Sequence, residues 1–435
     1  MKKTNTFQTI LLVVFGFCIM FALIIFATQK SGDKKEINYG TVKIWGTLPS
    51  VVMKESIDQI EANITITYEQ KKETSLRQDL IEEALAGGSG PDLVILPYGE
   101  FMDYKKFLYP VPYKDFSERD FTDTYIDQAS LYLANDGEFA LPLLVDPIVM
   151  YWNKEIFSSN AISVVPTVWD EFKVLAPSMT VRDDTKISRS TIPFGQYVNV
   201  NHAKDIISML IMQAGAPIVS SNKGVLTVNV NEKIGSVYPA TAAIEFFMEF
   251  SNSSLPTYSW NRSLSSSKDM FISGKSAVYF GYASEEEEIE KTNPHLSFDV
   301  AIVPQIRGSE RKLTFGRMNG VGILKNTSNV TGSLYAARLI TSGTVAEKLS
   351  QDLNLPPANR SLLAKEPGGV YLPVFYDSAI ISTSWADPSP DETSDIFEDT
   401  IEGILSSRYS VDLAVSGMER QLKQVIDQFV EKNSI

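Results

Sequence analysis

Cysteine and histidine are almost absent from this sequence. The 435 residues include one cysteine, Cys18, and two histidines, His202 and His295. A single cysteine excludes disulfide bonds within one chain and zinc sites built from cysteine. Two histidines so far apart also exclude a His-x-x-x-His helix of the metalloprotease type. We therefore expect no metal site and no cofactor.

Positive charge is also in short supply, with 39 basic against 53 acidic residues and a net charge of -14. An acidic body repels a phosphate backbone, so we expect no nucleic-acid partner. The sequence lacks a Walker A loop and a G-x-S-x-G elbow, which disfavours nucleotide hydrolysis and serine-hydrolase chemistry. We expect a protein that is not an enzyme. A surface glycosidase stays open as an alternative, because it needs only two carboxylates at a defined separation.

What the sequence does contain is typical of a large globular body. Hydrophobic residues make up 44% of the chain, beside 25 glycines and 21 prolines. Single hydrophobic cores stop growing at about 250 to 300 residues, so a chain of this length is expected to divide into two lobes. A ligand pocket between two lobes is then a natural feature.

One uncharged apolar segment lies near the N-terminus, from Ile10 to Ala27. As a helix it would span about 27 Å, close to the hydrocarbon thickness of a bilayer. We expect residues 1–9 in the cytoplasm, a transmembrane anchor at 10–27 that contacts the lipid bilayer, and a linker at 28–39. The body would then face outward from the cell membrane. Cleavage as a signal peptide and lipidation at Cys18 are the alternatives.

The segment after the linker alternates between strand and helix patterns. This alternation indicates an α/β fold with a parallel sheet covered on both faces. The stretch from Phe139 to Trp152 is apolar, and we expect two strands there, separated by Asp146-Pro147. The main expected elements are strands at 41–45, 64–68, 92–96, 276–282 and 297–304, and helices at 51–60, 76–86, 167–172, 203–214, 239–250 and 411–429.

Six short motifs, in order, resemble the solute-binding proteins of ABC importers, in the family that includes the maltose-binding proteins. They are KIWG at 43–46, GPDLV at 90–94, FALP through YWNKEIF at 139–157, PTVWDEF at 166–172, FISGKSAV at 271–278 and AIVP at 301–304. The fourth motif has one residue more than the family pattern between Thr and Trp. The resemblance covers about residues 40 to 430 of the chain.

The resemblance implies a two-lobed periplasmic-binding-protein-like fold with hinge strands that cross near 144–148, 298–306 and 353–357. The first lobe would comprise 40–145 and 304–355, and the second 146–303 and 356–435. It also implies a monomeric receptor that binds a sugar or related small polar solute in the cleft and delivers it to ABC permease subunits. A sensory or adhesion ectodomain of the same fold stays open as an alternative.

Aromatic residues at breaks after strands are candidate ligand contacts. Sugars present flat apolar faces and a ring of hydroxyl groups, which favour aromatic platforms beside carboxylates. Each ring could instead pack over the edge of a lobe. The candidates are Trp45, Tyr98, Trp260, Tyr282 and Trp385.

Two charged residues complete the expected site. Asp146 lies where the resemblance places a hinge carboxylate that accepts hydrogen bonds from sugar hydroxyls, and a purely structural role in the hinge is its alternative. Arg317 lies among glycines that allow close approach of the backbone. It could pair with a carboxylate of the ligand or with Asp146.

Two acidic segments are expected to be exposed to solvent and not to form functional sites. Residues 285–288 are expected to form a solvated face at the start of a helix. Residues 387–398 have oxygen-bearing side chains at the spacing of a calcium loop, but Glu392 replaces the required glycine. We therefore expect an exposed acidic loop at 387–398.

Overall fold

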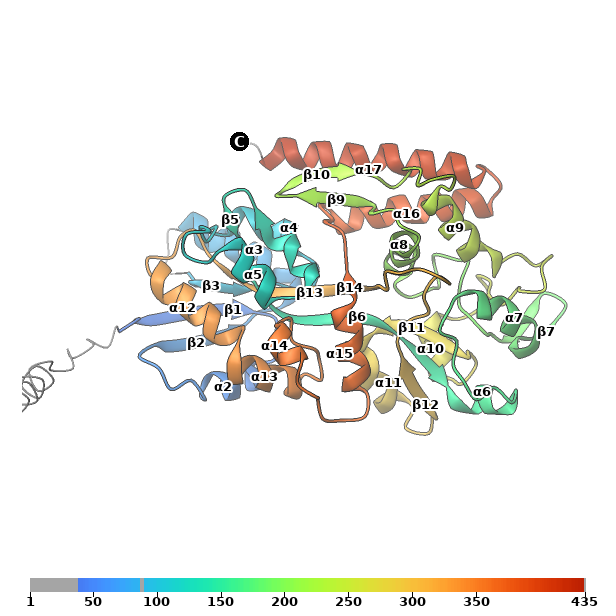
Figure 1. Ribbon diagram of the computed structural model, residues 1–435, viewed down its shortest axis with the longest axis horizontal. Helices are drawn as coiled ribbons and strands as arrows, with labels where there is room; N and C mark the ends of the chain where they lie inside the picture. Colours follow the sequence, from blue (N-terminus) through green and yellow to red (C-terminus); the bar gives the residue numbers. More distant parts are fainter. Residues whose placement is uncertain (1–37, 87–89, 434–435) are drawn as a thin grey trace, which may run out of the picture.

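A central sheet of eight strands runs through both lobes of the molecule (Figure 1). The computed structural model describes residues 38–86 and 90–433. Six strands follow the order β11-β6-β13-β3-β1-β2, and β12 and β14 pair with β6 and β13. These strands are β1 (Thr41–Gly46), β2 (Thr65–Gln70), β3 (Leu93–Ile95), β6 (Leu141–Asn153), β11 (Val278–Tyr282), β12 (Phe298–Ala301), β13 (Thr314–Ile323) and β14 (Ser382–Thr383).

Helices cover the sheet in both lobes. Around the first lobe lie α2 (Ser50–Ile57), α3 (Glu73–Ala86), α4 (Phe101–Tyr104), α5 (Glu118–Thr124), α12 (Val330–Ile340), α13 (Gly343–Asp352), α14 (Arg360–Leu363) and α15 (Leu372–Ile380). Around the second lie α6 (Lys154–Ser159), α7 (Asp170–Met179), α8 (Ala203–Gln213), α9 (Pro239–Glu249), α10 (Ser267–Ile272), α11 (Glu286–Thr292), α16 (Pro390–Leu405) and α17 (Val411–Asn433). Short 3₁₀ turns are η1 (Lys105–Phe107), η2 (Asp127–Tyr132) and η3 (Ala283–Glu285), and small hairpins are β4–β5 (Leu133–Ala134, Gly137–Glu138), β7–β8 (Val181–Asp183, Lys186–Arg189) and β9–β10 (Val219–Asn222, Val225–Val228).

The two-lobed α/β fold expected from the sequence is confirmed. Strands β1, β2 and β3 are parallel, as their alternation with helices predicts. Strand β13 then pairs antiparallel with both β3 and β6, which joins the parallel part to the strands of the second lobe. The expected lobe boundaries at 145/146, 303/304 and 355/356 stay a prediction, although residues of α14 and α15, which follow 355, pack into the first hydrophobic core.

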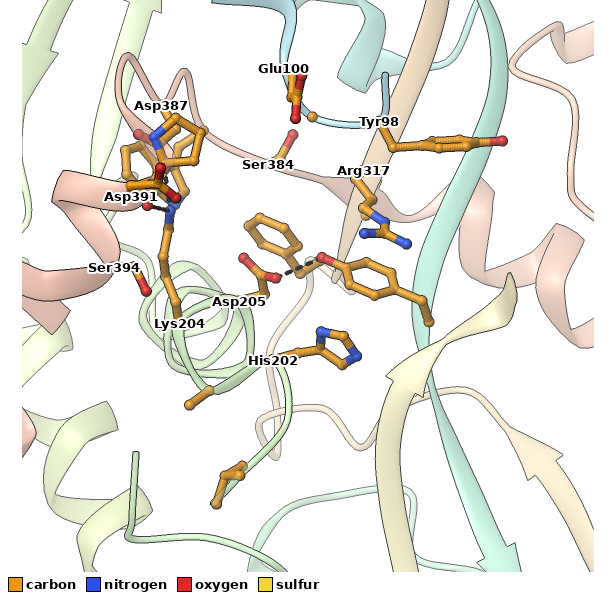
Figure 2. A pocket seen from close by; sticks show the side chains of 18 of the residues that line it. Tyr98, Glu100, His202, Lys204, Asp205, Arg317, Ser384, Asp387, Asp391 and Ser394 are labelled. Carbon is orange, nitrogen blue, oxygen red and sulfur yellow. Dashed lines mark hydrogen bonds and ion pairs between the residues drawn. The ribbon is translucent and has the colours of Figure 1, made fainter. Parts of the chain in front are cut away.

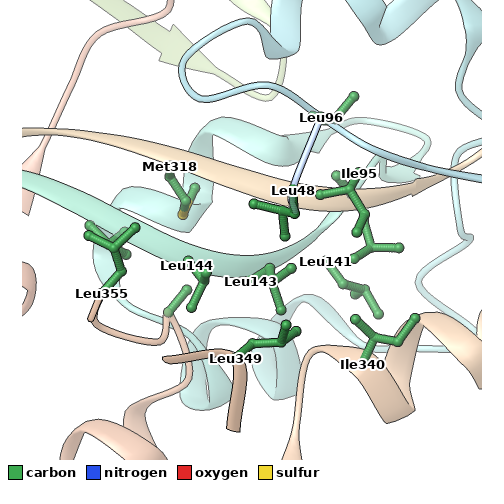
Figure 3. Packing of buried hydrophobic residues seen from close by; sticks show 14 of the residues in the cluster. Leu48, Ile95, Leu96, Leu141, Leu143, Leu144, Met318, Ile340, Leu349 and Leu355 are labelled. Atoms are coloured by element: carbon green, nitrogen blue, oxygen red, sulfur yellow. The ribbon is translucent and has the colours of Figure 1, made fainter. Parts of the chain in front are cut away.

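The structure has two hydrophobic cores: the first fills the first lobe and extends into the second through Phe271, Tyr279 and Phe298, and the second lies in the second lobe. Figure 3 shows part of the first core, where leucines of β6 pack between β13 and the helices α12 and α13. The second core is rich in aromatic rings, with Trp169 and Phe194 in contact with Phe280 of β11. Along one face of β6 the first core extends as far as Tyr151, while Ile148 and Met150 on the other face belong to the second core.

Strand β6 corrects one expectation, because residues 141–153 form a single strand and not two strands. Pro147 lacks a backbone N–H, which is why a break was expected there. It is paired with Gly316 at the end of the β13 ladder, and the next residue, Ile148, pairs with Tyr282 of β11. Pro147 therefore lies where β6 changes its partner strand, so the strand continues without the missing donor.

The segment at 387–398 is a second correction. Helix α16 begins at Pro390, so most of the expected acidic loop is helical. Pro390 occupies the first turn, where proline is favoured because its missing N–H has no partner in a helix anyway. The helix expected at 167–172 begins later, because α7 starts at Asp170 with Trp169 before it.

The predicted transmembrane segment at 10–27 lies outside the described residues. Within residues 38–86 and 90–433, none of the helices is both long and apolar enough to cross a bilayer. The described part begins just before β1, which lies between β2 and β3 in the parallel half of the sheet.

Candidate functional site

A cavity of about 470 Å³ lies between the two lobes (Figure 2). The first lobe contributes the loop after β3, at 98–100, and Glu73 at the start of α3. The second lobe contributes residues 202–205 at the start of α8 and residues at the start of α16. The start of β13, at 315–317, closes the cavity between them. This is the position at strand ends between lobes where α/β proteins of this kind form their ligand sites.

Arg317 lies between two tyrosine rings on one wall of the cavity. Its guanidinium carbon is 3.9 Å from the ring centroid of Tyr282 and 5.7 Å from that of Tyr98. Positive charge over an aromatic face is stabilising when water is partly excluded. The Tyr98 ring reaches this wall because Gly99, with a φ of +80°, turns the chain directly after it.

Asp146 lies beneath this wall and is fully buried. One oxygen accepts a hydrogen bond from the Ser284 N–H at 2.9 Å, and the other accepts from the Ser284 hydroxyl at 2.7 Å and from Arg317 Nη2 at 3.0 Å. Burial raises the pKa of the carboxyl, while Arg317 and Ser284 act to lower it. Direct contact of Asp146 with a ligand would require these bonds to break, so its geometry fits the positioning of Arg317.

Tyr282 joins the wall to the start of helix α8. Its hydroxyl donates a hydrogen bond of 2.7 Å to Asp205 Oδ2, and the His202 ring meets the tyrosine ring edge-on at 4.7 Å. Burial and then the Asp205 carboxylate raise the pKa of Tyr282. The tyrosine hydroxyl thus remains a donor at neutral pH and fixes one oxygen of Asp205.

His202 is held from behind by Glu285. The distance from His202 Nε2 to Glu285 Oε1 is 3.0 Å, and the Tyr279 hydroxyl donates to the other carboxyl oxygen at 2.7 Å. Burial raises the pKa of Glu285, but hydrogen bonding and charge from His202, with Tyr279 and Lys268, lower it to about 2. The expectation of a solvated acidic face at 285–288 is therefore wrong for Glu285 and for Glu286, which is buried.

Trp385 and Lys204 form the opposite wall. The Trp385 ring lies parallel to Phe397, with 6.4 Å between centroids, and its Nε1 donates to Ser208. Lys204 donates to the Asp387 carboxylate and to Thr393 at the start of α16. The acidic segment at 387–398 thus has one of its carboxylates in an ion pair, not exposed on a loop.

Glu100 faces the cavity from the first lobe. Burial, and then the neighbouring carboxylates Glu73 and Asp103, raise its pKa to about 7. Asp391 adds to the shift from the second lobe. In Figure 2, Glu100, Asp205 and Asp391 surround the open centre of the cavity.

Four of the seven residues expected from the sequence line the cavity: Tyr98, Tyr282, Arg317 and Trp385. The other three lie elsewhere. Asp146 is behind Arg317, while Trp260 is fully buried in the second core, where its Nε1 donates to Asn199. Trp45 is also buried; its Nε1 donates to Glu69, and Lys71 Nζ is 3.7 Å from its ring.

Sequence reasoning missed Glu100, His202, Lys204 and Asp205. A usable signal existed for the last three, because His202 directly precedes the amphipathic helix that was expected at 203–214. The first backbone N–H groups of a helix have no partner within the helix and are available to a ligand. No comparable signal marks Glu100, which reaches the cavity only through the turn at Gly99.

A family model for bacterial extracellular solute-binding proteins matches residues 47–341, more than half of the chain. The chain belongs to this family. Membership implies an extracytoplasmic location for the folded body, and it confirms the resemblance seen in the six motifs. A comparison with curated protein sequences gives no match.

Solved structures of other solute-binding proteins share the fold. A cyclo/maltodextrin-binding protein in complex with maltotetraose is 15% identical, with a TM-score of 0.72, over 91% of this chain and 99% of the other. The cyclic α-maltosyl-1,6-maltose binding protein from Arthrobacter globiformis is 14% identical, with a TM-score of 0.72, over 89% and 99%. The GacH receptor of Streptomyces glaucescens, studied with acarbose, is 16% identical, with a TM-score of 0.65, over 89% and 98%.

Proposed function

We propose that this protein is a receptor that binds a carbohydrate or related small polar solute between its lobes. The observation that carries the proposal is the cavity itself, to which both lobes contribute aromatic rings beside carboxylates. Rings such as those of Trp385 and Tyr282 match the apolar faces of a sugar, and Asp205 and Glu100 can accept hydrogen bonds from its hydroxyls. The solved relatives bound to maltotetraose and acarbose support a saccharide as the solute class.

The proposal includes tethering and delivery. Residues 10–27 would anchor the receptor in the cell membrane, and residues 28–39 would let the folded body reach permease subunits of an ABC importer. Membership of the solute-binding family supports the transport role. The cavity between lobes that share hinge strands supports closure around the solute before delivery.

Titration calorimetry on the full-length protein in detergent tests this function. Neutral and charged mono- to trisaccharides are titrated into wild type and into Trp385→Ala and Trp45→Ala variants. Wild type is expected to bind at least one of them, and Trp385→Ala should bind it about tenfold or more weakly because a stacking face is lost. Trp45→Ala is the matched control, because Trp45 lies away from the cavity, and its affinity should change less than about twofold.

Two outcomes would contradict the proposal. One is the absence of binding by every saccharide, and the other is equal affinity in wild type and Trp385→Ala. The titrated mixtures are also analysed for shortened saccharides. Release of product would favour a glycosidase over a receptor.

A further inference from the structure

The basic side chains of the cavity are already neutralised by the protein. Three such side chains line it among the described residues: His202, Lys204 and Arg317. Lys204 pairs with Asp387, Arg317 pairs with Asp146 at 3.0 Å, and His202 lies 3.0 Å from Glu285. These bases therefore have little charge left to offer an anionic solute.

Four carboxylates of the lining form no ion pair in the described part of the chain, although Glu73, Asp205 and Asp391 lie in the first turns of their helices, where the helix dipole favours negative charge. They are Glu73, Glu100, Asp205 and Asp391. Across residues 38–86 and 90–433, no ion pair engages any of them, although Asp205 accepts the Tyr282 hydroxyl. After the pairs are cancelled, the cavity carries about four negative charges when all four groups are ionised. A lining with this excess attracts cationic solutes and repels anionic ones.

The excess is divided between the lobes. Glu73 and Glu100 belong to the first lobe, and Asp205 and Asp391 belong to the second. Bringing like charges together across a partly dry cleft is unfavourable. Burial, then Glu73 and Asp103 of the same lobe, raise the pKa of Glu100, and Asp391 across the cleft adds the smallest contribution. A cation placed between the lobes would remove the repulsion and favour closure, whereas a neutral solute would leave it in place.

The cation is better supplied by an organic amine than by a metal ion. In the part of the chain that the structure describes, no three acidic or histidine side chains converge closely enough to hold a metal. The walls instead offer the aromatic rings of Trp385, Tyr98 and Tyr282, which suit a carbon skeleton attached to the charge.

We propose that the solute is a saccharide that carries a protonated amine, and that Glu100, Asp205 and Asp391 hold this amine between the lobes. The inference rests on the proposed function, since it names the solute class for the same cavity. It assigns the carboxylates a selective role: they admit amino sugars, tolerate neutral sugars poorly and reject sugar acids.

Matched saccharides test the inference near neutral pH in calorimetry on the full-length protein in detergent. The sets are glucose, glucosamine and glucuronate, and then cellobiose and the corresponding disaccharide of glucosamine. Maltose and maltotriose serve as neutral saccharides of the other linkage. Each amino form is expected to bind about tenfold or more tightly than its hydroxyl counterpart, and glucuronate should not bind.

Two single variants, Glu100→Gln and Asp391→Asn, separate charge from shape. Each should weaken binding of the amino sugars by about tenfold and leave or improve the affinity for neutral sugars. The matched control is Glu61→Gln, which removes an exposed carboxylate outside the cavity and should change neither. Asp391 is itself exposed on the first turn of α16, so its variant keeps the fold even if Glu100→Gln does not.

The outcomes distinguish a failure of this inference from a failure of the proposed receptor function. If neutral sugars bind as tightly as their amino forms, or glucuronate binds best, the inference is overturned and the receptor function stands. Stabilisation by calcium or magnesium alone, lost in Glu100→Gln, would also overturn it in favour of a metal. If no saccharide of the panel binds, the proposed function fails and the inference fails with it.

Discussion

The side-chain carboxyl oxygens of Glu138, at the end of β5, have no hydrogen-bond partners in the described part of the chain. It is fully buried, and it lines a small cavity together with apolar residues such as Val111 and Leu141. Burial raises its pKa from 4.5 to about 7. The folded state therefore holds this proton more tightly than the unfolded chain does.

This difference gives a pH-dependent contribution to stability. The contribution is fully present below a pH of about 4.5 and decreases as the pH rises toward 7, by roughly 3 kcal/mol in total. Glu138→Gln cannot ionise, so at a pH of about 8 it should be more stable than wild type by about 2 to 3 kcal/mol. The gain should fall below about 1 kcal/mol near pH 5, as measured by urea unfolding.

Glu61→Gln serves as the exposed control and should show no pH-dependent gain. A constant difference between Glu138→Gln and wild type at both pH values would contradict the assignment of the shift to Glu138.

The candidate site was partly predictable residue by residue. Tyr98 and Tyr282 could be chosen because each was expected at the end of a strand, Trp385 because it lies in a polar segment, and Arg317 because it lies among glycines. The structure brings all four to the cavity. Trp260 has the same sequence signature but is buried, because Asn199 bonds its Nε1 and draws the loop into the second core. Sequence alone does not show which loops a neighbouring lobe covers.

At the scale of elements, the periodic segments were the predictable ones. The run from β1 to β3 follows the expected strand and helix alternation, because apolar residues recur there with clear periods. Strand β6 was not predictable as one strand, since a change of partner at Pro147 depends on β11 and β13, which lie far away in sequence. The start of α16 carried a readable signal, Ser389-Pro390, that the acidic composition obscured.

The loop that carries Trp260 is expected to be a stability element of the second lobe. Trp260→Ala should leave a large cavity in the core and lower the free energy of unfolding by about 3 to 5 kcal/mol. Solute affinity of the folded protein should stay within about twofold of wild type, because the ring does not line the cavity. Urea unfolding and calorimetry measure the two quantities separately.

The comparison variant is Trp385→Ala, which removes a ring that does line the cavity. It should lower affinity, in contrast to Trp260→Ala. A tenfold loss of affinity in folded Trp260→Ala would show instead that this ring contacts the solute.

On the scale of the whole molecule, the second lobe reaches the first at the tip of hairpin β9–β10. Lys223 Nζ lies 3.0 Å from Glu118 Oε2 of α5. Both side chains are more than 40% exposed, so the pair contributes at most about 1 kcal/mol. It can nevertheless bias the balance between open and closed lobes by a few-fold.

Reversing the charge tests this bias. Lys223→Glu places two carboxylates together, and the radius of gyration without solute should increase in small-angle scattering while affinity falls about two- to fivefold. The double variant Lys223→Glu/Glu118→Lys should restore both values. Lys291→Glu, which disrupts a pair within α11, is the control and should alter neither. Unchanged scattering in Lys223→Glu would remove the role of this contact in closure.

The path of the chain through the first core has a consequence for the timing of folding during synthesis. That core takes in Phe375 and Ala379 of α15, a helix that packs against β6, more than 200 residues earlier in the sequence. The hydrophobic core of the first lobe therefore cannot be completed until nearly 380 residues have left the ribosome. For a chain destined for the outside of the cell, this late formation of the core would keep the nascent polypeptide unfolded, and so competent for export, through most of its synthesis.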